Sequence, residues 1–307
     1  MSDDSDGNGR AVRDGVQRFI FEDADVRGEI VQLDSVVRDA TRHHAYPPEV
    51  ASLIASALAA TSLLMATVKM TGRVTLQIQG DGPVDRVVVQ ARTEGSLRAT
   101  ARCGSVEAAD GEEAGAGLGA LCGRGHLAIT LEPDGQERYQ GVVELDQAGL
   151  APTLERYFQN SEQLPTRIVL SGEPERSGGL LLQRLPDVVG SDADAWNRIE
   201  QLGTTVRGDE LLDLDAEEVL HRLFHQERVR VFEPQPLGFR CKCSDGRVGG
   251  ILRGLGREEV HSILAEQGQV EVRCEFCGAV YRYDAVDAEA ALAGDTGSGV
   301  RGSGQYH

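Results

Sequence analysis

The pattern of apolar and polar positions predicts helices first and then a series of strands. A helical period over 34–43 precedes an uncharged stretch over 50–68, which we interpret as a buried helix. The ranges 73–79 and 84–90 are rich in β-branched residues and flank Gly80-Asp81-Gly82-Pro83, so they predict a hairpin. A helix is predicted over 153–163, and further strands are predicted at 97–102, 126–131, 138–144, 167–170 and 179–184. This mixture indicates an α+β domain over 11–186.

The segment 187–233 changes to a helical and acidic pattern. It holds 12 Asp or Glu against 5 Arg, a local net charge of −7. Asp215 is placed to cap a helix, and Glu218 follows three residues later, as a capping box requires. Isolated helices of about 12 residues are marginal in water. We therefore interpret 187–233 as a helical linker that depends on docking against a neighbour.

A small compact domain is predicted over 234–291. Its pattern contains a strand over 269–273, a second strand within 279–286, and a helix over 257–267 that ends at Gly268. Few large apolar residues lie within it, and a unit of about 55 residues with so small a core normally needs a staple such as a metal. The ends, 1–10 and 292–307, are polar and Gly-rich, so we expect disordered tails.

Composition and charge narrow the classes of partner. The 307-residue chain has a net charge of −18, which repels phosphate and anionic lipid, so neither nucleic acid nor membranes are expected partners. The stretch 50–68 is near the length of a membrane span, but its hydroxyl side chains and alanines favour a buried helix. The first thirty residues lack a secretory signal. We therefore expect a cytoplasmic protein, whose cysteines are metal ligands, redox sensors or buried thiols rather than permanent disulfides.

Four cysteines carry the strongest chemical signal in the sequence. A CxC pair and a CxxC pair are separated by thirty residues, and their members are Cys241, Cys243, Cys274 and Cys277. Two close cysteine pairs can supply all four tetrahedral ligands of Zn²⁺. A filled tetrahedron leaves no open position for water or substrate, so the metal is predicted to be structural or regulatory rather than hydrolytic. Arg240, Lys242 and Arg273 can offset the net −2 charge of four thiolates on one dication.

Spacing alone leaves two interpretations of this metal open. One is an inert zinc ribbon. The other is a redox switch, because thiolates are the form that oxidants attack and each close pair offers a resolving partner. Disulfide formation would eject the metal, whose binding contributes roughly 10 to 16 kcal/mol in small zinc peptides. Its loss is then expected to unfold a unit with so little core.

The remaining candidate residues carry weaker signals. His221 and His225 lie four apart but lack the glutamate of HExxH, and we interpret them as partly exposed helix residues. His261 would be a fifth ligand. Cys103 and Cys122 are interpreted as small core residues. No catalytic motif stands out, so the protein is not expected to be an enzyme.

Two alternative functions belong to other classes. A constitutive zinc-stabilised binding module for RNA or ribosomes would form a salt-sensitive complex, and the negative charge argues against it. An enzyme that uses Cys103 or Cys122 would need a strongly lowered thiol pKa.

Several motifs in one order resemble the redox-regulated bacterial heat-shock protein 33 chaperones, also called the 33 kDa chaperonin. The resemblance runs from about residue 14 to 291. It is most specific in FRCKCS at 239–244 and in LGREEVHSILAEQGQVEVRCEFCGAVYRY at 255–283. Supporting motifs include VRGEIV from Val26, YFQNSEQLPTRI from Tyr157 and GGLLLQRLP from Gly178.

The resemblance implies a cytoplasmic, ATP-independent holdase that is inactive when reduced and bound to one Zn²⁺ per chain. It implies that the four cysteines are the zinc ligands, and that oxidation pairs Cys241 with Cys243 and Cys274 with Cys277. It further implies that the C-terminal domain and the linker 187–233 then unfold. The active form is expected to be a homodimer that binds unfolding client proteins during oxidative stress.

Overall fold

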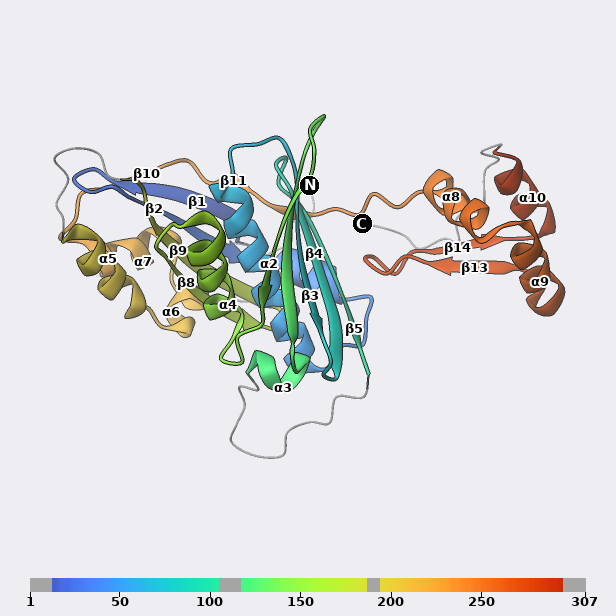
Figure 1. The fold of residues 1–307 in the computed structure, drawn as a ribbon, viewed down its shortest axis with the longest axis horizontal. Coiled ribbons are helices and arrows are strands. Elements are labelled where there is room, and N and C mark those ends of the chain that lie inside the picture. Colours follow the sequence, from blue (N-terminus) through green and yellow to red (C-terminus); the bar gives the residue numbers. More distant parts are fainter. Residues whose placement is uncertain (1–12, 105–116, 187–193, 295–307) are drawn as a thin grey trace, which may run out of the picture. The chain divides into compact units, whose positions relative to one another are not determined.

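The computed structural model describes residues 13–104, 117–186 and 194–294, so the predicted tail at 1–10 and most of that at 292–307 lie outside the described residues. The chain divides into two compact units, Met1–Arg240 and Cys241–His307 (Figure 1). The predicted mixed α+β class is confirmed, because the N-terminal unit combines two sheets with a central helix and further helices.

The first sheet of the N-terminal unit has six strands in the order β10-β1-β2-β9-β8, with β11 also paired to β1. Its strands are β1 (Asp14–Phe21), β2 (Val26–Leu33), β8 (Thr166–Glu173), β9 (Arg176–Arg184), β10 (Val229–Val231) and β11 (Gln235–Pro236). All of these pairs are antiparallel. Strand β1, near the start of the unit, therefore pairs with β10 and β11, which lie near its end.

The second sheet has the strand order β12-β5-β4-β3-β6-β7. Its strands are β3 (Gly72–Gly80), β4 (Val84–Arg92), β5 (Ser96–Cys103), β6 (Gly125–Pro133), β7 (Tyr139–Glu144) and β12 (Gly238–Phe239). The β3–β4 hairpin confirms the turn predicted at 80–83, and only the short β12 pairs in parallel, with β5. Because β11 and β12 pair with β1 and β5, the N-terminal unit extends to Arg240.

Helix α2 (Pro48–Thr67) forms the core between the two sheets, as Figure 1 shows, and contacts strands of both. Within the described part of the chain it is the one helix long and apolar enough to cross a membrane, and 83% of its most apolar window is buried inside the protein. The predicted buried helix over 50–68 is confirmed. The short α1 (Ser35–Thr41) precedes it, and α3 (Leu118–Cys122) packs near β3 and β4.

The helix predicted over 153–163 has two parts. Helix α4 (Leu150–Tyr157) continues into a π-helical turn, η1 (Phe158–Glu162), which ends where Gln163 adopts a left-handed backbone conformation with φ 56°.

Strands β1 and β2 of the first sheet were not predicted from the sequence.

Three short helices cover the face of the first sheet opposite to α2 (Figure 1). They are α5 (Ala195–Thr204), α6 (Gly208–Asp213) and α7 (Ala216–Phe224), and we call them the α5–α7 segment. The Phe224 ring lies 5.0 Å from the Phe21 centroid and 6.2 Å from that of Phe19, which ties α7 to β1.

The predicted capping box at Asp215 is wrong. Asp215 occupies the N-cap position of α7, but its side chain accepts no cap hydrogen bond. Its carboxylate lies instead 3.4 Å from the guanidinium Nε of Arg13. The Asp215 carboxylate is thus used in an ion pair with Arg13 and not in hydrogen bonds to the amides of the first turn of α7.

Over its described residues, 241–294, the C-terminal unit is built from three helices and a two-stranded sheet. Its elements are α8 (Asp245–Leu255), α9 (Arg257–Gln267), β13 (Val270–Arg273), β14 (Val280–Tyr283) and α10 (Ala285–Ala293). The end of α9 at Gly268 is confirmed, with φ 75°. Helices α8 and α10 were not predicted, and the tail expected from residue 292 begins too early, because Leu292 lies within α10 and packs on the core. Among the described residues of this unit, the core has seven buried members: Val248, Leu252, Val260, Val270, Tyr283, Ala288 and Ala291.

Candidate metal centre

Two short loops carry the four cysteines. Cys241 and Cys243 precede α8, whose N-cap Ser244 accepts a hydrogen bond from the Arg247 amide. Cys274 and Cys277 lie in the tight connection between β13 and β14, where the Cys274 amide donates to Ala279 and the Gly278 amide donates to Cys274, each at 2.9 Å. Gly278 has φ 66°, a conformation that glycine adopts at little cost.

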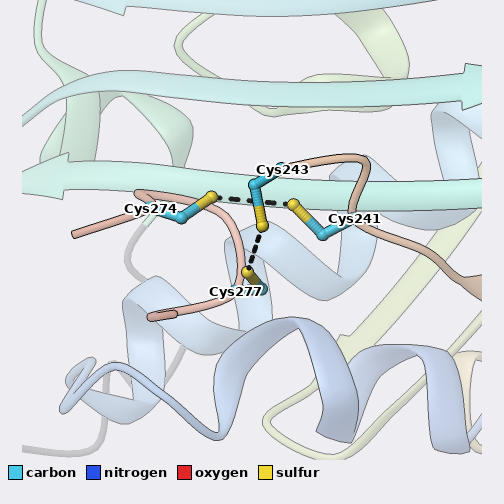
Figure 2. Close-up of side chains that lie close together, drawn as sticks. All are labelled: Cys241, Cys243, Cys274 and Cys277. Carbon is cyan, nitrogen blue, oxygen red and sulfur yellow. Dashed lines mark hydrogen bonds between the residues drawn. The ribbon is translucent and has the colours of Figure 1, made fainter. Parts of the chain in front are cut away.

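The four sulfurs point toward one another (Figure 2). All four Sγ atoms lie within 4.8 Å of one another. The two closest contacts join the loops: Cys241 Sγ lies 3.6 Å from Cys274 Sγ, and Cys243 Sγ lies 3.3 Å from Cys277 Sγ. These separations are far longer than a disulfide bond of about 2.05 Å, so in the described part of the chain none of the four cysteines is joined in a disulfide.

The spacing of the sulfurs suits a tetrahedral metal ion. A Zn–S distance of about 2.3 Å places tetrahedral ligands about 3.8 Å apart. The observed contacts of 3.3 and 3.6 Å, within an envelope of 4.8 Å, bracket that value. Four sulfur donors without an oxygen or nitrogen ligand are typical of structural zinc. The residues present therefore fit the ion.

The thiols perturb one another strongly. The hydrogen bond with Cys274 lowers the pKa of Cys241, and the same bond, together with burial, raises the pKa of Cys274 to about 12. Burial raises the pKa of Cys277 to about 12. Among the sulfurs alone, Cys241 is thus the most acidic of these three, and it is half-buried beside exposed Arg240 and Lys242.

Tyr281 is a residue of this centre that the sequence did not identify. It lies on β14 opposite Val272, and its hydroxyl hydrogen-bonds to Cys243. Burial first, and then this bond, raise the pKa of its phenol. A tyrosine four residues after the CxxC pair is the only sequence signal that could have identified it.

The other candidate residues do not join the cluster. His261 is paired with Glu289 on α10, and exposed His221 and His225 lie with ring centroids 6.1 Å apart. Cys122 is fully buried, and burial raises its pKa to about 11, which opposes the lowered pKa that a catalytic thiol needs. Cys103 packs against the core beside α2. Among the described residues, only the four C-terminal cysteines form a group that could hold a metal.

Comparison with known proteins gives the family. The family model described as Hsp33 protein matches residues 14–284. The chain belongs to the Hsp33 family. Similar curated proteins are the 33 kDa chaperonins of Shewanella woodyi, 46% identical with 92% of this chain and 96% of that protein covered, and of Nitrosococcus oceani, 46% identical with 90% and 93% covered. The resemblance drawn from the sequence motifs is confirmed.

A solved structure shares the Hsp33 fold. The crystal structure of the 33 kDa chaperonin (heat shock protein 33 homolog) from Thermotoga maritima matches with a TM-score of 0.81 and 24% identity, covering 91% of this chain and 98% of that one. Family membership and the names of the relatives support a chaperone role. The Hsp33 family is a family of chaperones rather than enzymes.

Proposed function

We propose that this Hsp33 chain is a redox-regulated, ATP-independent holdase of the cytoplasm. Reduced and loaded with one Zn²⁺ on Cys241, Cys243, Cys274 and Cys277, it is inactive. Oxidation of these cysteines activates it to bind unfolding client proteins and protect them from aggregation. The observation that carries the proposal is the convergence of four sulfurs within 4.8 Å in a unit whose described part, 241–294, has a core of seven buried residues.

The bound ion would supply cross-linking between the two cysteine loops. Apolar packing around the ion contributes little further stability, because the described C-terminal core contains one large aromatic residue and two alanines among its seven buried members. A domain of this size rarely reaches independent stability without a staple. We therefore expect the C-terminal unit to unfold when its thiolates are consumed.

Oxidation by a peroxide balances within each cysteine pair. One thiolate attacks the peroxide, which gives a sulfenic acid and a hydroxide; the second thiolate then displaces a second hydroxide and forms the disulfide. We propose Cys241–Cys243 and Cys274–Cys277 as the pairs, so two peroxides are reduced per chain. The closest native sulfur contacts join Cys241 with Cys274 and Cys243 with Cys277. Once the two loops separate, however, only cysteines of the same loop remain near each other, which favours the proposed pairs.

A candidate client surface lies buried beneath the α5–α7 segment. The segment itself lies within the predicted linker 187–233. The segment covers an apolar face of the first sheet that includes Phe19, Phe21, Ile30 and Leu182, each no more than 4% exposed. Release of the segment would uncover this face and the apolar side of the helices. Exposed patches of this kind bind other proteins, including a second copy, and we propose a homodimer as the active form.

The test measures zinc content, free thiols and suppression of client aggregation in the same samples, before and after peroxide at elevated temperature. We expect loss of zinc, loss of four thiols and gain of activity together. A Cys103→Ser, Cys122→Ser double variant is the matched control and should switch normally. Unchanged zinc, with full activity already present in reductant, would overturn the proposal.

A further inference from the structure

The C-terminal end of α6 lacks the usual helix-ending device. The helix has six residues, and the residue that follows it, Leu214, is extended with φ −90° and ψ 156° rather than left-handed. The last four carbonyls of a helix have no partner within the helix. Here the Glu210 carbonyl accepts the Leu214 amide, which leaves the carbonyls of residues 211–214 to find partners elsewhere.

Gln32 on β2 supplies two of these partners. Its side-chain Nε2 donates to the carbonyl of Leu211 at 2.8 Å and to that of Leu214 at 2.7 Å. Gln32 is only 7% exposed, so both bonds are shielded from water. A buried amide with both N–H groups used fixes the position of the helix end closely.

Two arginines supply the remaining partners. Arg13, just before β1, donates to the Leu214 carbonyl at 2.6 Å and to the Asp213 carbonyl at 2.9 Å. Arg176 on β9 donates to the Leu212 carbonyl at 3.4 Å and pairs with the Asp213 carboxylate at 2.7 Å. Positive groups at a helix C-terminus also complement the helix dipole.

Four consecutive carbonyls at the C-terminal end of α6, those of residues 211–214, are thus capped by side chains of the first sheet and its N-terminal extension. The sheet is shaped for this approach at Gly178 on β9, where a Cβ atom would lie 2.8 Å from the Leu211 carbonyl oxygen. The contacts of Arg13 and Gln32 join residues about 180 to 200 positions apart, and those of Arg176 join residues 36 and 37 apart. All of them run from the α5–α7 segment to the first sheet or its N-terminal extension, so they hold the segment to the core rather than stabilise it internally.

We propose that Arg13, Gln32 and Arg176 form a carbonyl latch that holds α6 on the first sheet and sets how readily the α5–α7 segment leaves it. The latch contains no thiol. Its side chains bind backbone carbonyls and the Asp213 carboxylate, so its strength is independent of the oxidation state of the cysteines. The consequence for activity rests on the proposed function. In a protein with a weakened latch, the α5–α7 segment would leave the sheet while zinc is still bound. That protein would then bind clients without oxidation.

The test is hydrogen exchange of the full-length, reduced, zinc-loaded protein. Arg176→Ala and Gln32→Leu are the latch variants. Arg222→Ala is the matched control, because Arg222 also pairs with a carboxylate of α6, Glu210, but lies on α7 and not on the sheet. We expect amides of the α5–α7 segment to exchange about ten-fold faster or more in both latch variants. Zinc content and exchange in α8–α10 should match the wild type.

Equal exchange in Arg176→Ala and wild type, or an equal increase in Arg222→Ala, would overturn the latch. If burial at Gln32 prevents that variant from folding, Arg176→Ala decides, because its side chain is 30% exposed. The exchange result does not depend on holdase activity. A latch confirmed in a protein that never protects clients would refute the proposed function and leave the latch standing.

Discussion

From a buried carboxyl group in the first sheet, we predict that the folding stability of this protein depends on pH. Glu29 on β2 is 1% exposed and lies opposite Arg18 on β1 and Leu181 on β9. Its Oε2 atom is buried without a hydrogen-bond partner in the part of the chain that the structure describes. Burial raises the pKa of Glu29 from 4.5 to about 7, and the charges of Arg27 and Arg18 offset part of this increase.

The sign of the effect follows from the raised pKa. Below pH 4.5 the carboxyl is protonated in both the folded and the unfolded chain, and its ionisation costs nothing. Between pH 4.5 and 7 the unfolded chain ionises first, so folding stability falls, and above pH 7 the whole cost is present. A shift of this size corresponds to about 3 kcal/mol. We expect Glu29→Gln to raise the free energy of unfolding by up to that amount at pH 8, and by less than about 1 kcal/mol at pH 5.

Urea unfolding of the reduced protein, followed by circular dichroism at both pH values, checks this prediction. Glu132→Gln is the matched control with the opposite sign, because the hydrogen bond from Arg73 lowers the pKa of Glu132. That variant should be destabilised at pH 8. A Glu29→Gln protein with the same stability gain at pH 5 and pH 8, or with a loss at pH 8, would show that the buried charge is not the cause.

Three further predictions concern the metal centre, the α5–α7 segment and the core thiol. Cys277→Ser should abolish tight zinc binding and unfold the C-terminal unit, seen as lost metal and collapsed amide dispersion in NMR spectra. Phe224→Ala should destabilise docking of α7 by about 3 to 5 kcal/mol, seen as faster hydrogen exchange in α5–α7. Cys122 should react with a thiol reagent at pH 8 far more slowly than a free cysteine, because burial raises its pKa to about 11.

Each of these outcomes has a control. Cys103→Ser should keep zinc, so metal loss in both cysteine variants would point to general misfolding. Phe232→Ala removes a phenyl ring that is 43% exposed, and it should leave exchange in α5–α7 unchanged. Rapid labelling of Cys122 in the native protein would contradict its burial next to the β3–β4 turn.

The sequence predicted most of the second sheet and the central helix because their patterns are local. Strands β3 to β7 alternate or are β-branched, and a glycine-rich turn marks the first hairpin. Strand β2 was missed because both of its faces are buried and it contains Arg27, Glu29 and Gln32, so it neither alternates nor reads as apolar. Helix α8 was missed because glycines at 246, 249, 250 and 254 lower its helix propensity.

The candidate metal centre was predictable because CxC and CxxC spacing limits what four cysteines can do, and the structure brings all four sulfurs together. The polar contacts around α6 were not predictable. They join Arg13 and Gln32 to residues near 213, and no local pattern encodes pairing over such separations. Likewise Asp215 was assigned a local cap, whereas its partner is Arg13.

The strands that flank the α5–α7 segment limit where it can go. The chain enters the segment after β9 and returns as β10, and both strands belong to the first sheet, three positions apart in the order β10-β1-β2-β9. Neighbouring strands are about 4.8 Å apart, so the two anchor points are separated by about 14 Å. Once undocked, the segment would be a loop tethered at both ends and not a loose arm. If the proposed redox switch operates, the segment's search for the sheet on return to reducing conditions would be short, which would favour rapid and reversible recovery of the resting protein.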